Sequence, residues 1–131
     1  MLDRLARKHT AVAEHIPAPV VDDHAHAPLG IVTLGSCELA VLEAIELLGK
    51  RDVSADYMRI RGFPFGIAVR AFLEAHDTIV VVEQNRDSQL RTLLTLETPV
   101  PKEKLRSVLA YGGYPLSAED VVDGITKLLE A

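Results

Sequence analysis

The pattern of apolar and polar positions divides the chain into alternating strand-like and helix-like segments. Short apolar runs, of the kind that form buried strands, occupy residues 30–36, 55–61, 78–84 and 106–111. The clearest is "TIVVVEQN", whose four consecutive apolar residues suit a strand buried on both faces. Each run is followed by a segment with apolar residues at helical spacing. The pattern therefore predicts four strand–helix units.

The last helical segment, "SAEDVVDGITKLLEA", is the best defined. Ser117 stands at the N-cap position, and Asp120 takes the capping-box position that Glu or Gln usually fills. Residues 2–15, before the first strand, carry spaced apolar positions among charges and predict a further helix.

Strands that alternate with helices form a parallel sheet covered on both faces. We expect a three-layer α/β/α fold over residues 30–131, with a mainly parallel sheet of four strands in the order 2-1-3-4. We expect residues 1–29 to form an N-terminal helix followed by a proline-rich lead-in. The prolines at 17, 19 and 28 prevent the helix from continuing through the lead-in. Residues 18–22 of this lead-in can add a short antiparallel edge strand.

This strand order places a topological switch point between the first and third strands, where such sheets usually bind ligands or partners. The loops that meet there contain Gly35 and Ser36 on one side and Glu83, Gln84 and Asn85 on the other. We expect Ser36 to cap the following helix, because this turn matches neither a dinucleotide-binding nor a P-loop motif.

Glu83 would be costly to bury without a partner. Structural stabilisation is the favoured interpretation, through the amides of the next loop or through Arg59 or Arg61, and ligand contact is the alternative.

Composition narrows the function classes. The chain has 131 residues, 48% hydrophobic and 25% charged, with a net charge of −5 and no basic stripe with interleaved aromatics, so nucleic acid is a poor partner. No apolar run reaches the ~20 residues that span a bilayer, and the N-terminus lacks a signal-peptide core. The single cysteine, Cys37, suits a reducing compartment. We expect a cytoplasmic protein that does not contact a membrane.

The segment "VVDDHAHAPLG" offers a candidate metal site, because His24 and His26 would share one face of a strand. The pair precedes the predicted sheet and lies among prolines, and a catalytic barrel would need about 200 residues. A solvated linker is the favoured interpretation, and a metal-dependent hydrolase is the alternative.

Three stretches of the chain together resemble a known family. They are "GIVTLGSCELAVLEAIELLGKRDVSADYMRIRGFPF", "TIVVVEQNRDSQLRTLL" and "YGGYPLSAEDV". The combination is similar to the transketolase C-terminal-like domain at the C-terminal end of the alpha subunit of 2-oxoacid:ferredoxin oxidoreductases. Departures occur at Ser88, where the family usually has glycine before Gln89, at Gly112, where it often has aspartate, and at Gly66, where it often has proline.

The resemblance implies a complex that oxidatively decarboxylates pyruvate, 2-oxoglutarate or a related 2-oxoacid to acyl-CoA, with thiamine diphosphate, magnesium and iron–sulfur clusters. It implies no catalytic, cofactor-binding or metal-ligating residue in this chain, which has one cysteine where a cubane cluster needs four. We expect a non-catalytic assembly domain, either excised from a longer subunit or naturally short, inactive in isolation and packed against other domains, other subunits or a second copy. The residues expected at that interface are Gly35, Ser36, Glu83, Asn85, Ser88 and Gln89. The alternative function is a stand-alone small α/β ligand-binding module that uses the same switch point.

Overall fold

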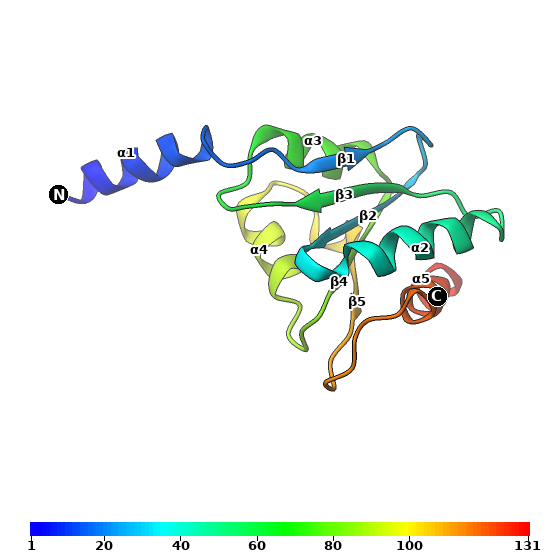
Figure 1. Cartoon of the computed structure of the whole chain (residues 1–131). Helices are drawn as coiled ribbons and strands as arrows, with labels where there is room; N and C mark the ends of the chain where they lie inside the picture. The colour runs from blue at the N-terminus through cyan, green and yellow to red at the C-terminus, as the bar shows by residue number, and fades with distance from the viewer.

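The computed structural model describes all residues, 1–131, as five strands and five α-helices with two short 3-10 turns (Figure 1). The strands are β1 (Val20–Asp22), β2 (Leu29–Leu34), β3 (Asp56–Ile60), β4 (Thr78–Glu83) and β5 (Leu105–Leu109). The helices are α1 (Leu2–Ala13), α2 (Glu38–Gly49), α3 (Ile67–Ala75), α4 (Gln89–Glu97) and α5 (Ala118–Glu130), and the 3-10 turns are Gly35–Cys37 and Lys102–Lys104.

The strands form one sheet in the order β1-β3-β2-β4-β5. Its last four members are mutually parallel and have the predicted order of the four main strands. β1 is the antiparallel edge strand expected from the lead-in, and it pairs Val20 with Arg59 and Asp22 with Tyr57 of β3. The predicted fold class is confirmed, and the edge strand brings the sheet to five strands.

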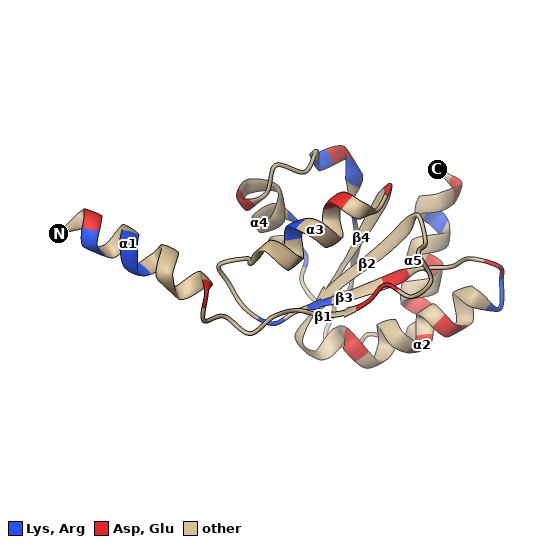
Figure 2. Cartoon of the chain, turned by 90° about the horizontal axis from the view of Figure 1, so that it is seen from above, with Lys and Arg blue, Asp and Glu red and all other residues tan.

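Helices cover both faces of the sheet (Figures 1 and 2). One core lies between the sheet and the pair α2 and α5, and the other between the sheet and the pair α3 and α4. Along β4 the side chains alternate between the two cores: Val80 and Val82 face the first, and Ile79 and Val81 face the second. All four are completely buried, so the prediction of a strand buried on both faces is confirmed.

The predicted start of the last helix is also confirmed. Ser117 is the N-cap of α5; its hydroxyl oxygen accepts a hydrogen bond from the backbone N–H of Asp120 at 3.1 Å. The Asp120 carboxylate in turn accepts one from the backbone N–H of Ser117, also at 3.1 Å. This reciprocal pair satisfies two N–H groups that the start of a helix otherwise leaves free.

α1 forms where the sequence predicts it, but it stands away from the body of the molecule (Figures 1 and 2). None of its residues is buried. The lead-in then returns to the sheet as β1. No helix of the structure has the length and apolar character needed to cross a membrane.

Candidate interface at the carboxyl ends of the strands

The loops after β2 and β4 lie side by side at the switch point, as the strand order predicts. The Ser36 hydroxyl donates a hydrogen bond to Oε1 of Gln84 at 3.1 Å and so joins the two loops. The expectation that Ser36 caps α2 is wrong: Ser36 lies inside the 3-10 turn Gly35–Cys37, and α2 begins after Cys37 without a side-chain cap. The turn is possible because Gly35 has a φ of +65°, a region that glycine adopts without steric cost.

Glu83, the last residue of β4, is buried with 3% of its surface exposed. Its carboxylate accepts hydrogen bonds from the backbone N–H groups of Leu90 and Arg91 in the first turn of α4, the second at 3.1 Å. It therefore satisfies two N–H groups of the helix start and places its negative charge at the positive end of the helix dipole. This geometry agrees with the structural interpretation of Glu83.

The proposed ion pairs of Glu83 are not formed, because both arginines have other partners. Arg59 binds Glu38 of α2 at 2.9 Å, and Arg61 donates to the carbonyl of Ala18 in the lead-in at 3.5 Å. Arg59 faces α2 rather than the loop after β4. Of the two kinds of partner that the sequence offered for Glu83, the backbone amides are the ones it binds.

Asn85 holds the loop between β4 and α4. Its amide donates to Glu83 at 2.9 Å, and its carbonyl oxygen accepts from the N–H groups of Asp87 and Gln89 at 3.1 and 3.3 Å. The loop ends at Ser88, which has the left-handed φ of +52° and ψ of 46°. A glycine adopts this conformation freely, whereas a serine is strained there. The structure thus gives a physical reason why the family that this chain resembles usually has glycine at this position.

The loops border a cavity of about 290 Å³ at the same edge of the sheet. Two of its apolar lining residues are accessible at the surface, Leu34 with 48% and Phe63 with 40% of their surface exposed. Gln89 is exposed at its rim, whereas the Glu83 carboxylate is engaged inside the domain. Of the expected interface residues, Gly35, Ser36 and Gln89 are therefore open to a partner, and Glu83 and Asn85 fix the shape of the loop.

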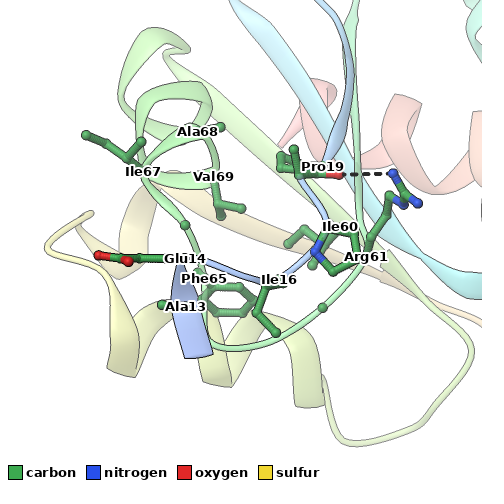
Figure 3. A pocket seen from close by; sticks show the side chains of 14 residues that line it. Ala13, Glu14, Ile16, Pro19, Ile60, Arg61, Phe65, Ile67, Ala68 and Val69 are labelled. Atoms are coloured by element: carbon green, nitrogen blue, oxygen red, sulfur yellow. Dashed lines mark hydrogen bonds between the residues drawn. The ribbon is translucent and has the colours of Figure 1, made fainter. Parts of the chain in front are cut away.

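A second groove, of about 440 Å³, lies next to this cavity (Figure 3). It separates the lead-in from the start of α3, and Ile16, Phe65 and Val69 give it apolar walls. Arg61, which binds the lead-in carbonyl, contributes the basic group of its lining. The lead-in and the strand ends thus form one largely apolar edge.

The two histidines of the lead-in lie at the opposite, amino-terminal edge of β3. His24 is exposed, and its Nδ1 lies 2.7 Å from the carboxylate of Asp22. His26 lines a separate cavity of about 500 Å³ together with Asp56 and His76, a buried pair that the sequence analysis did not single out. No group of three or more His, Cys, Asp or Glu side chains is arranged to hold a metal ion. Cys37 is buried in the core.

Comparison with known proteins gives this arrangement a context. The chain is 30% identical, over 99% of its length, to the alpha subunit of 2-oxoacid:ferredoxin oxidoreductase 2 of Aeropyrum pernix. It is homologous to part of that alpha subunit. The homologous part is only 21% of the relative, so the chain spans about a fifth of the oxidoreductase subunit that it matches. No family model matches the chain.

Solved structures agree. The 2-oxoglutarate:ferredoxin oxidoreductase of Magnetococcus marinus superposes with a TM-score of 0.77 at 25% identity, covering 90% of this chain and 21% of that chain. The alpha chain of a probable 2-oxoacid ferredoxin oxidoreductase from Thermoplasma acidophilum gives 0.59 at 23% identity, covering 87% and 98%. A split-gene transketolase gives 0.65 at 21% identity, covering 86% and 41%. The resemblance to the transketolase-like domain of 2-oxoacid oxidoreductases is confirmed.

Proposed function

We propose that this chain is an assembly domain of a thiamine-diphosphate-dependent 2-oxoacid:ferredoxin oxidoreductase and does not itself carry the reaction. The observation that carries the proposal is the homology to the oxidoreductase alpha subunit over 99% of the chain but only 21% of the relative. The complete complex would convert a 2-oxoacid such as pyruvate or 2-oxoglutarate to acyl-CoA in the cytoplasm, and this domain would position its neighbours.

The polar groups at the strand ends support a structural role. A catalytic acid or base must be free to reach a substrate. Glu83 is buried and caps α4, and the side-chain amide and carbonyl of Asn85 are both hydrogen-bonded within the loop. A four-cysteine iron–sulfur cluster does not fit the one buried cysteine, and in our proposal the clusters, thiamine diphosphate and magnesium bind elsewhere in the complex.

The same edge offers a surface for neighbouring domains. Leu34 and Phe63 are exposed beside the cavity that Glu83 and Gln89 help to line, and exposed apolar groups that lie together mark interaction sites. We propose that the other domains and subunits of the oxidoreductase pack here, against Gly35, Ser36, Gln89 and the loop that Ser88 closes.

Affinity purification of the tagged chain from its own cells tests the proposal. We expect 2-oxoacid oxidoreductase subunits to copurify, identified by mass spectrometry, and to be lost with Leu34→Glu. The matched control is Leu96→Glu, because Leu96 is 75% exposed and lies on α4 outside this cavity. Absence of oxidoreductase subunits would contradict the family-level proposal, and their retention by Leu34→Glu would contradict only the proposed surface.

A second measurement addresses the cofactor. Titration calorimetry of the isolated chain with thiamine diphosphate and magnesium should show no saturable binding, and the chain should not decarboxylate a 2-oxoacid. Stoichiometric cofactor binding would favour the alternative, a stand-alone α/β ligand-binding module.

A further inference from the structure

No residue of α1 is buried against the rest of the chain. Leu2, Leu5 and Val12 recur at helical spacing and are 80%, 56% and 45% exposed. The last turn of α1 has no basic residue to oppose the helix dipole. His9 touches the body, its ring edge-on to Phe63 with centroids 6.1 Å apart. Exposed apolar side chains that lie together mark interaction sites, so we expect another surface to cover the apolar stripe of α1.

The charge of α1 indicates which surface fits. α1 carries Arg4, Arg7 and Lys8 against the single acid Asp3, in a chain whose net charge is −5. Figure 2 shows these basic residues on α1 and acidic residues along α2. The covering surface should therefore be acidic and should expose an apolar strip of its own.

The outer face of α2 has both properties. Leu39 and Leu42, one helical turn apart, are 79% and 39% exposed. Glu43 and Glu46 are exposed on the same helix, and no basic residue lies in its last turn. α2 is also firmly anchored, because Val41, Ala44 and Leu48 are buried in the core on its other side. It is a rigid acidic helix whose outward leucines have no partner within the chain's core.

We propose that two copies of this chain form a two-fold dimer in which the α1 of each copy packs on the α2 of the other. Leu2, Leu5 and Val12 would cover the partner's Leu39 and the partner's Leu42, and Arg4 and Lys8 would face the partner's Glu43 and the partner's Glu46. A reciprocal contact of this kind closes with two copies and leaves no free arm. The inference uses only this chain's own surfaces and does not depend on the proposed function.

Charge-swapped variants test the contact. In variant A, Arg4→Glu and Lys8→Glu make α1 acidic; in variant B, Glu43→Lys and Glu46→Lys make α2 basic. All four positions are exposed, so both variants should fold, which circular dichroism can verify. In a dimer of A alone two acidic helices would meet, and in a dimer of B alone two basic helices would meet. In a mixed dimer both contacts have opposite charges.

Sedimentation equilibrium over a range of concentrations gives the outcome. The wild type should dimerise, A and B should each dimerise at least ten-fold more weakly, and an equimolar mixture should recover the wild-type affinity. Leu5→Asp should also abolish the dimer, whereas the matched surface change Leu96→Asp should not. A wild type that stays monomeric, unchanged self-association of A or B, or a mixture that fails to recover would each overturn the proposal.

Discussion

Nε2 of His76, at the end of α3, lies 3.0 Å from Oδ2 of Asp56, the first residue of β3, and both side chains are 3% exposed. Nδ1 of His76 lies 2.7 Å from the carbonyl oxygen of Phe72, so each ring nitrogen faces an oxygen that accepts hydrogen bonds. The same Asp56 oxygen accepts from the backbone N–H of Ala27 at 3.0 Å. One buried carboxylate thus ties the lead-in, a strand and a helix together.

Replacing His76 should therefore be costly. His76→Ala leaves the Asp56 carboxylate buried without its imidazole partner, and we expect a loss of about 3–5 kcal/mol in the free energy of unfolding. Urea denaturation measures it. The control His24→Ala, at a side chain 90% exposed, should change stability by less than about 0.5 kcal/mol. If His76→Ala lowered the free energy of unfolding no more than His24→Ala does, the buried pair of Asp56 and His76 would not stabilise the fold.

The centre of the sheet should not tolerate a charge. Val81 is completely buried in β4 against the core beneath α3 and α4, so Val81→Asp should cost several kcal/mol and prevent soluble expression. Val21→Asp, on the exposed edge strand β1, is the matched control and should express normally. A soluble, cooperatively unfolding Val81→Asp protein would contradict the central position of this strand.

Relieving the backbone strain in the loop before α4 should stabilise the protein. Ser88→Gly removes the steric cost of a left-handed residue but makes the unfolded chain more flexible, so we expect a net gain of up to about 1 kcal/mol. Ser107 donates a 3.3 Å hydrogen bond to the Ser88 hydroxyl, and Ser107→Ala measures that contact separately. Destabilisation by Ser88→Gly well beyond the Ser107→Ala effect would mean that strain at this position is unimportant.

One tyrosine should titrate unusually late. Burial, and then the negative charge of Glu38, raise the pKa of Tyr57 to about 12. A phenol whose pKa is raised by folding stabilises the protein fully below its unfolded pKa of about 10, and this stabilisation is lost as the pH rises through the folded pKa. An ultraviolet absorbance titration of the three tyrosines should contain a component near pH 12 that Tyr57→Phe removes. Persistence of that component in Tyr57→Phe would assign it to another residue.

Asp22 and His24, the exposed pair in the lead-in, should shift each other's pKa. The hydrogen bond between Asp22 and His24 raises the pKa of His24 and lowers the pKa of Asp22. The contribution of His24 is present below its unfolded pKa and lost as the pH rises through the folded pKa, and that of Asp22 is lost as the pH falls through its lowered pKa. The pair therefore stabilises the fold at pH values between the lowered pKa of Asp22 and the raised pKa of His24. An NMR titration should show the pKa of His24 fall in Asp22→Asn; an unchanged value would show that the contact does not form in solution.

The sequence by itself determined the layers of this protein. A strand buried on both faces needs an unbroken apolar run, and "TIVVVEQN" has one, so β4 and its parallel neighbours could be predicted together with their order. The capping pair Ser117 and Asp120 is equally local, because its two residues lie within one turn of the same helix. The family resemblance likewise depended on motifs within continuous segments, and homology over 99% of the chain confirms it.

Only the tertiary structure decided how the polar side chains are used. Glu83 could have met an arginine, a ligand or a backbone amide, and the choice depended on where the first turn of α4 lies in space. Ser36 joins Gln84, 48 residues away in the sequence, instead of capping the next helix. Asp56 and His76 have no sequence signature as a pair, because they lie 20 positions apart in the chain with a whole helix between them. The exposure of α1 was equally hidden: the sequence predicts a helix there, but only the fold shows that none of its residues is buried and that His9 alone makes a ring contact with the body, at Phe63.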